Sequence, residues 1–434
     1  MSSMLFALED GRWFDFPGLA MAGADRSPRA PRRQELIPLP AGATLTMMPG
    51  LAPVGLNKAD GSPVVLSQDP YGGGGPVYAL AALLPQGFTR LLCPATEEKD
   101  LPLPLLGYTA VGMEKGRLVV AARQTDEHKK WHPRYFNTPE LARLTEERIA
   151  EFPDNRLIRH LAHCALEYGC FTAQNIFYRR WEGGIPASPV CNAQCLGCIS
   201  LQPSQCCPSP QQRIAFRPHA EEIAEIALAH LRHAADAIVS FGQGCEGEPS
   251  LNHTAIAEAI RRVRRQTRRG SFNINTNAGD TQAIHALLEA GMDSLRVSMF
   301  SPLPEEYAAY HRPCGYGLAQ VRESLLLAKE YRRPASLNLL VYPGFSDDPR
   351  RLDALTDLVG ETGVAQIQLR NLNCGPALMT PFLADSQGMG MLRFIEELGR
   401  RLPQVQIGSY THAGQNGPAG VAARRVQAQR KSRR

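Results

Sequence analysis

The sequence has no long apolar segment. None of its 434 residues belongs to a run of the roughly 20 uninterrupted apolar residues that a membrane-spanning helix needs. The first residues, MSSMLFALEDGRW, lack the basic and long apolar stretches of a signal peptide. Charged residues make up only 21% and hydrophobic residues 44%, which excludes a disordered chain and a small disulfide-stapled scaffold. We therefore expect a cytoplasmic protein with no membrane partner, built from two or three domains of roughly 100–200 residues.

Disulfides are rare in a reducing cytoplasm, yet the chain has eleven cysteines. An odd number of cysteines in that compartment points to metal binding or catalysis. The net charge of +5 is less informative, because six basic and no acidic residues lie between Ala413 and Arg434. Without this segment the chain is close to neutral. Residues 413–434 are expected to form a basic disordered tail, through which the protein could hold nucleic acid electrostatically.

Residues 1–125 are predicted to form a β-rich N-terminal domain, because short β-like segments alternate there with Gly and Pro. The segments are Leu45–Met48, Pro63–Ser67, Val77–Leu83, Tyr108–Met113 and Leu118–Ala122. The pattern then turns helical, so residues 126–184 are predicted to be a helical connector.

From residue 185 onward, β-like segments alternate with amphipathic helices. The strands are expected at Ala237–Phe241, Phe272–Asn275, Leu295–Ser298, Leu337–Val341, Ile367–Leu369 and Val405–Ile407. Repeated βα units predict an α/β fold with a parallel sheet, whose chemistry gathers at the carboxyl ends of the strands. We assign residues 185–385 to the core and residues 386–412 to a C-terminal helix and strand.

A compact cysteine motif, Cys191-Asn-Ala-Gln-Cys195-Leu-Gly-Cys198, opens this region. Three thiolates within eight residues can surround one soft metal centre. The same residues would also suit a structural zinc site, with Cys206 or Cys207 as the fourth ligand. A third interpretation is a set of unligated thiols, which would be easily oxidised in a loop.

Four features together resemble the radical S-adenosylmethionine (radical SAM) superfamily over roughly residues 185–385. They are the cysteine triplet, Gly247-Glu248-Pro249, Asn275-Thr276-Asn277 and Ser298, each placed near the end of an expected strand. The resemblance implies an incomplete parallel (β/α)6-type barrel, preceded by the smaller β-rich domain and the helical connector. It also implies a low-potential electron donor as a partner.

The resemblance assigns a role to each of these residues. Cys191, Cys195 and Cys198 would hold three irons of a [4Fe–4S] cluster, and S-adenosylmethionine would chelate the fourth. The Gly247-Glu248-Pro249 turn would contact the amino group of S-adenosylmethionine. Asn275 and Asn277 would belong to its binding site, and Ser298 would lie near its ribose.

One position departs from the family pattern. The residue before the third cysteine is usually aromatic in the family and packs on the adenine, but here it is Gly197. The adenine contact is then expected from elsewhere, with Leu196 and Ile199 as candidates.

Other polar residues near strand ends are candidates for substrate contacts or catalysis. Cys245, Cys314 and Cys374 are the candidate catalytic residues, or ligands of an auxiliary cluster. Plain thiol packing is the alternative, and Cys164 and Cys170 are expected to be packed. Cys206 and Cys207 are open to a role near the cluster.

Charged and amide side chains supply the candidates for recognition. Arg370, Asn371 and Asn373 could bind a polar or anionic substrate. Arg296 is expected either to face the carboxylate of S-adenosylmethionine or to join a structural network. Glu246 either faces substrate or is solvated.

The sequence therefore predicts a radical SAM enzyme acting on an unidentified small molecule, peptide or RNA. The alternatives are a zinc-stabilised nucleic-acid-binding protein and an iron–sulfur electron carrier. The first would bind zinc, and the second would bind a cluster without cleaving S-adenosylmethionine.

Overall fold

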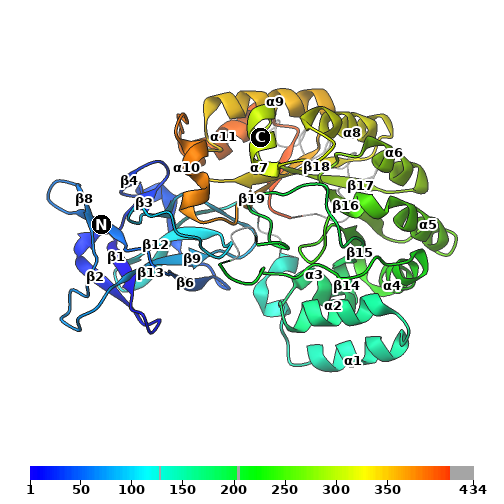
Figure 1. The fold of residues 1–434 in the computed structure, drawn as a ribbon, viewed down its shortest axis with the longest axis horizontal. Coiled ribbons are helices and arrows are strands. Elements are labelled where there is room, and N and C mark those ends of the chain that lie inside the picture. Colours follow the sequence, from blue (N-terminus) through cyan, green and yellow to red (C-terminus); the bar gives the residue numbers. More distant parts are fainter. Residues whose placement is uncertain (127–128, 203–205, 411–434) are drawn as a thin grey trace, which may run out of the picture.

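The computed structural model describes residues 1–126, 129–202 and 206–410. The expected basic tail, residues 413–434, lies outside the described residues. The structure has two regions, each built on a β-sheet. The sheet from the first part of the chain is antiparallel, and the sheet from the last part is parallel and covered by helices (Figure 1).

The second region is a seven-stranded, wholly parallel sheet whose strands follow one another in sequence order. Its strands are β14 (Arg180–Gly184), β15 (Ala235–Phe241), β16 (Ser271–Thr276), β17 (Ser294–Met299), β18 (Ala335–Val341), β19 (Gln366–Asn371) and β20 (Gln406–Gly408). The predicted incomplete parallel barrel is confirmed. Because β14 and β20 fall outside residues 185–385, the sheet extends beyond the predicted core at both ends. The domain boundaries themselves stay predictions.

Helices follow the strands and cover one side of this sheet (Figure 1). They are α4 (Ala220–His233), α5 (His253–Arg264), α6 (Thr281–Ala290), α7 (Pro304–His311), α8 (Leu318–Glu330), α9 (Pro349–Thr362), α10 (Thr380–Leu383) and α11 (Met391–Arg401). Each long helix buries an apolar stripe, such as Ile256, Ile260 and Val263 on α5. No helix in the described ranges combines the length and apolarity needed to cross a bilayer.

Three connector helices lead into the sheet and pack on its first units. They are α1 (Leu141–Glu151), α2 (Arg156–Leu166) and α3 (Phe171–Tyr178). Their buried faces join the same apolar core as the barrel helices, through side chains such as Leu161 and Phe177. The connector is therefore fixed to the barrel by the hydrophobic effect.

The N-terminal region is a ten-stranded antiparallel sheet with a small three-stranded sheet beside it. The larger sheet contains β1 (Ser3–Ala7), β2 (Trp13–Ala20), β5 (Leu36–Pro38), β6 (Thr44–Met48), β7 (Val54–Asn57), β8 (Pro63–Val65), β9 (Tyr78–Leu83), β10 (Phe88–Arg90), β12 (Tyr108–Glu114) and β13 (Arg117–Gln124). The smaller one contains β3 (Gly23–Ala24), β4 (Pro28–Arg29) and β11 (Cys93–Pro94). All five β-like segments expected from the sequence are strands, whereas β1 and β2 were not predicted.

A fully buried arginine joins the two regions. The Arg90 guanidinium, at the end of β10, donates to Tyr108 O at 2.9 Å and to Leu372 O at 2.9 Å. Its backbone N–H donates to Asn371 Oδ1 at 2.8 Å, and its charge lies 4.8 Å from the centre of the Tyr342 ring. One side chain therefore satisfies carbonyls of both regions at the carboxyl end of β19.

Replacing Arg90 with leucine is expected to destabilise the protein. Each carbonyl left buried without a donor costs about 1–3 kcal/mol, so the midpoint of urea unfolding should fall clearly. Arg123→Leu, at an exposed position on β13, is the matched control and should leave the midpoint nearly unchanged. Equal midpoints for the two variants would show that Arg90 does not hold the regions together.

Candidate functional site

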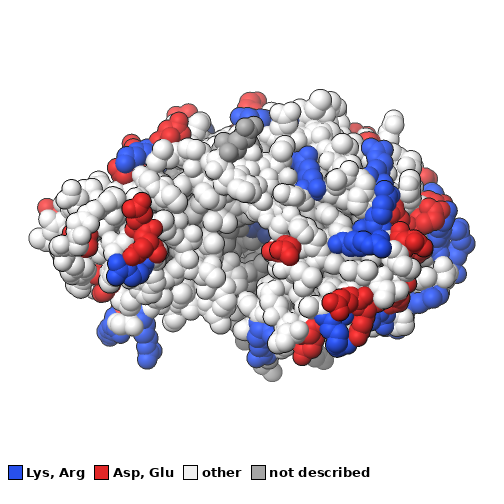
Figure 2. All heavy atoms as spheres, turned by 60° about the horizontal axis from the view of Figure 1, so that its bottom comes forward, with Lys and Arg blue, Asp and Glu red and all other residues white. Residues whose placement is uncertain are grey.

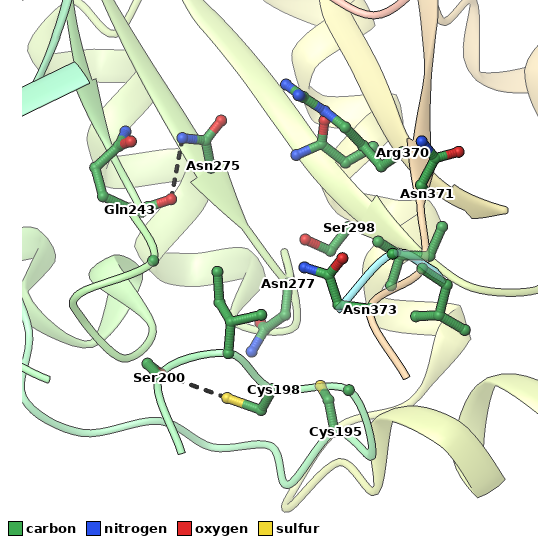
Figure 3. A pocket seen from close by; sticks show the side chains of 18 of the residues that line it. Cys195, Cys198, Ser200, Gln243, Asn275, Asn277, Ser298, Arg370, Asn371 and Asn373 are labelled. Atoms are coloured by element: carbon green, nitrogen blue, oxygen red, sulfur yellow. Dashed lines mark hydrogen bonds between the residues drawn. The ribbon is translucent and has the colours of Figure 1, made fainter. Parts of the chain in front are cut away.

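A cavity of about 620 Å³ lies between the carboxyl ends of the parallel strands and the N-terminal region. Its wall combines residues that follow β14 to β19 with two segments of the N-terminal region, residues 83–88 and 106–107. Figure 2 shows a hollow in the middle of one face, where the surrounding surface carries few charged side chains. Figure 3 shows part of the lining from close by, including the labelled side chains of Cys195, Cys198, Asn277 and Arg370.

All three cysteines of the motif line this cavity. Their loop, between β14 and α4, is held by backbone hydrogen bonds from Gln194 N to His311 O at 3.1 Å and from Leu196 N to Tyr310 O at 3.1 Å. Burial raises the pKa of Cys191 to about 11 and that of Cys195 to about 12. A metal that binds these thiols must therefore displace their protons.

The spacing of the three sulfurs disfavours a single zinc ion. Two thiolates on one tetrahedral zinc lie about 3.8 Å apart, given a Zn–S distance of about 2.3 Å. Within the described ranges, only one set of three metal-binding side chains has all its ligand atoms within 4.8 Å of one another. That set does not include the cysteines of the motif. The triplet is thus spread more widely. Three half-buried thiols that line an open cavity fit a cluster in which each sulfur binds a different iron.

Two side chains at the cysteines were not predicted. Arg213 Nη2 lies 3.5 Å from Cys198 Sγ, and Ser200 Oγ lies 3.4 Å from the same sulfur (Figure 3). His311 Nδ1 lies 3.3 Å from Cys195 Sγ, and burial lowers the pKa of His311 to about 3, so its ring is neutral. A lone Arg or His carries no spacing signal, so neither residue could be found from a pattern in the chain.

The loop after β15 is organised by two buried carboxylates. Glu246 accepts four backbone N–H groups, from Ala187 and Ser188 at 2.7 and 3.2 Å and from Gly242 and Gln243 at 2.6 and 2.7 Å. Burial raises the pKa of Glu246 to about 8, although the four N–H donors act to lower it. Of the two expectations for Glu246, solvation is wrong. Both oxygens are engaged by the backbone, so its role here is to hold the loop.

Glu248 is the second carboxylate of this loop. It accepts from Thr276 Oγ1 at 2.6 Å and from Asn277 N at 2.8 Å, and burial raises its pKa. Gly247 separates the two glutamates, and a Cβ there would lie 2.0 Å from Val190 O. Only glycine therefore fits between the loop and the segment before the cysteines.

The remaining expected cofactor residues lie on neighbouring strand ends. Asn275 donates to Phe241 O at 2.9 Å, and Asn277 donates to Asn192 Oδ1 at 2.7 Å, beside the cysteine loop. Ser298, Asn275 and Asn277 all line the cavity (Figure 3). Gly247 and Glu248 do so too, but Pro249 does not.

The additional cysteines are not at the cavity. Cys245 and Cys374 are buried and Cys314 is exposed, and none of these candidate catalytic residues is part of the lining. Cys206 and Cys207 have their sulfurs 2.9 Å apart and likewise do not line it. We therefore assign these five cysteines no role at the site.

The candidate substrate residues differ in their contacts. Asn371 lines the cavity (Figure 3) and is also engaged with the N-terminal region through Phe88 O at 3.0 Å and Arg90 N. Arg296 does not line the cavity but is paired with buried Glu182 at 3.2 Å, which favours the structural network. Arg370 and Asn373 line the cavity (Figure 3). Arg370 donates to Gln368 Oε1 at 2.9 Å, and burial lowers its pKa to about 10.

The glycine before the third cysteine has a steric cause. A Cβ at position 197 would lie 2.5 Å from Tyr310 Oη and 3.0 Å from Asn373 O. Tyr310 lines the cavity, with its ring 4.1 Å from that of Phe300 in a stacked arrangement. An aromatic ring is thus present beside residue 197, but it comes from α7. Of the two expected alternatives, Ile199 lines the cavity and Leu196 does not.

Gly197→Ala is expected to lower the thermal stability of the protein, because overpacking of this kind costs about 1–3 kcal/mol. Tyr310→Phe removes the oxygen that the new methyl group meets, so the double variant should regain part of the lost stability. The measurement is the unfolding midpoint of the two single variants and the double variant. An additive loss in the double variant would contradict this account.

Comparison with known proteins identifies part of the chain. Residues 185–355 match the family model described as the radical SAM superfamily. No curated protein sequence matches the chain significantly. Among solved structures, SuiB of Streptococcus suis bound to S-adenosylmethionine matches with 10% identity over 64% of this chain and 63% of that chain, at a TM-score of 0.39. The match therefore spans less than two thirds of SuiB.

Two further structures give similar values. Methylornithine synthase, PylB, is 16% identical over 61% of this chain and 78% of that chain, with a TM-score of 0.37. The FeFe-hydrogenase maturase HydG from Carboxydothermus hydrogenoformans is 14% identical over 67% of this chain and 70% of that chain, with a TM-score of 0.37.

Proposed function

This chain belongs to the radical SAM superfamily through its residues 185–355, and on that premise we propose that it cleaves S-adenosylmethionine reductively to start hydrogen abstraction from a substrate. The observation that carries the proposal is the convergence of the cysteine triplet, Gly247-Glu248, Asn275, Asn277 and Ser298 on one cavity. These residues come from four different strand ends. The fold brings them together although the chain separates them.

Cys191, Cys195 and Cys198 would hold a [4Fe–4S] cluster. When bound, the cluster supplies the electron that breaks the C5′–S bond of S-adenosylmethionine and gives the 5′-deoxyadenosyl radical. A low-potential donor must deliver that electron. Arg213, beside Cys198, would offset part of the negative charge of the thiolates and sulfides.

Glu248 would bind the amino group of S-adenosylmethionine. Its carboxylate is already oriented by Thr276 and Asn277, so little ordering is required when a cation arrives. Asn277 and Ser298 add polar contacts along the same edge of the sheet. The N-terminal residues 83–88 and 106–107 close the far side of the cavity and would keep water from the reacting atoms.

Tyr310 would take the part that the missing aromatic residue plays in the family. It lies against Gly197 and lines the cavity, so it supplies an aromatic ring beside the position where the family has one. Ile199 would add an apolar contact.

The central test measures 5′-deoxyadenosine. The protein is purified without oxygen, reconstituted with iron and sulfide, reduced with dithionite and given S-adenosylmethionine. Wild type should form the product and bind about four irons, whereas Cys195→Ala should form none. Cys314→Ala changes an exposed thiol outside the cavity and is the matched control.

Two results would replace the proposal by its alternatives. A reducible iron–sulfur protein that leaves S-adenosylmethionine intact, with and without candidate substrates, would be an electron carrier. A colourless protein whose triplet holds zinc would be a zinc-stabilised protein, and the nucleic-acid-binding hypothesis would then apply.

The substrate is proposed to carry a carboxylate or phosphate. Arg370 is a cation in the cavity wall, and no carboxylate in the described part of the chain forms an ion pair with it; its side chain donates to the neutral Gln368. The neighbouring cation Arg296 is already paired with Glu182. This part of the cavity thus has an excess of positive charge, which an anionic group would complement.

A screen for compounds that stimulate S-adenosylmethionine cleavage tests this assignment. Acids are expected to stimulate, whereas their neutral amides or esters should do so at least tenfold less, since a hydrogen bond to a charged group contributes about 1.5–3 kcal/mol. A neutral compound as effective as its acid would contradict the role given to Arg370.

A further inference from the structure

Three metal-binding side chains meet outside the cavity, where the connector packs on the barrel. His160 and Cys164 lie on α2, four residues apart and hence on one face of the helix. Cys245 comes from the loop after β15. The ligand atoms of the three all lie within 4.8 Å of one another, and the described part of the chain has no other such set.

The separation of the two ligand atoms on α2 suits tetrahedral coordination of zinc. His160 Nε2 and Cys164 Sγ are 3.5 Å apart. A nitrogen about 2.1 Å and a sulfur about 2.3 Å from one zinc ion, at the tetrahedral angle, lie about 3.6 Å apart. The helix therefore already holds two ligands at the separation that zinc requires.

Burial gives the set the character of a structural site. Cys164 is 0% and Cys245 2% exposed, while His160 is half-buried and leaves a path for an ion to enter. A fourth thiol is near the set but not part of it. Cys170 directly precedes α3, and its N–H donates to Cys164 O at 3.0 Å, while its sulfur lies 3.3 Å from Thr172 Oγ1. The hydrogen bond between the two thiols lowers the pKa of Cys164 and raises that of Cys245, so the pair shares a proton that zinc would displace.

We propose that His160, Cys164 and Cys245 bind a structural Zn²⁺ ion, and that the Cys170 side chain rotates away from Thr172 to complete the tetrahedron when zinc binds. Mixed thiolate and imidazole ligands are those that zinc prefers, and closed four-ligand sites of this kind are structural. Binding forms bonds from zinc to the sulfurs and the ring nitrogen, and it releases the thiol protons to solvent. No oxidant or reductant is involved.

This site would act on the cavity through the loop that follows β15. Cys245 directly precedes Glu246, whose carboxylate holds that loop, and Glu248 follows two residues later. Zinc would fasten the loop to α2 from the side that faces away from the cavity, since none of its ligands is in the lining. The proposal is independent of the radical chemistry, which depends on the other cysteines.

The test is the metal content of the full-length protein, made in zinc-supplemented medium, purified without oxygen and dialysed against a weak chelator. Wild type should retain about one zinc per chain, in addition to any iron. His160→Ala and Cys164→Ser should each lose zinc to the chelator at least tenfold more readily. His163→Ala, on the same helix at an exposed position, is the matched control and should keep its zinc.

A second comparison separates this site from the triplet. Cys198→Ser should lose iron but retain zinc, while His160→Ala should retain the capacity to take up iron. The proposal would be overturned if the wild-type protein held no zinc, or if both His160→Ala and Cys164→Ser retained it. It would also be overturned if zinc were lost only when a cysteine of the triplet is replaced. A disulfide between Cys164 and Cys245, located by peptide mapping of the unreduced protein, would overturn it as well, because it would remove two of the ligands. His160→Ala spares the core, so misfolding of Cys164→Ser alone would not decide the result.

Discussion

The site depends on the hydrogen bonds that the Glu246 carboxylate accepts from four backbone N–H groups. Two of these donors belong to the segment that leads into the cysteine loop, and two belong to the turn after β15. One carboxylate therefore sets the distance between the cysteine loop and the loop that carries Glu248. A side chain that donated as well as accepted could not satisfy all four groups, which is why the position requires a carboxylate.

The N-terminal region is the second constraint. It contributes part of the cavity wall, and its position is fixed by polar contacts that leave little freedom: Arg90 reaches the carbonyl of Leu372, and Asn371 bonds both Phe88 and Arg90. Since buried polar groups of this kind are satisfied in only one arrangement, the wall and the sheet form a single unit. The enclosure of the cavity is thus a property of both regions.

Local patterns predicted much of this arrangement. The alternation of amphipathic helices with short apolar strands predicted the parallel sheet. The cysteine spacing and the strand-end motifs predicted residues that line one cavity. β1 was missed because SMLFA has no polar alternation, and β2 because Pro17 and Gly18 interrupt it.

Contacts between distant segments were the least predictable. Asn371 lines the cavity as expected, but its bond to the N-terminal region was not foreseen, and Cys164 was expected to be merely packed but meets Cys245. Neither partner is encoded by a nearby residue or by a period in the sequence. The roles of the site residues as ligands stay predictions that only the bound groups can test.

The steric contact between Gly197 and Tyr310 has a consequence for the history of this chain. Because the methyl group of even an alanine would meet the tyrosine oxygen, position 197 cannot take a larger residue while this tyrosine is kept, whereas position 310 can take a smaller one while glycine is kept. An ancestor with a large residue at position 197 could not have had this tyrosine in the same place. Among related sequences, a tyrosine at position 310 should therefore always be accompanied by glycine at position 197, and their joint presence would mark the lineage better than the cysteine motif alone.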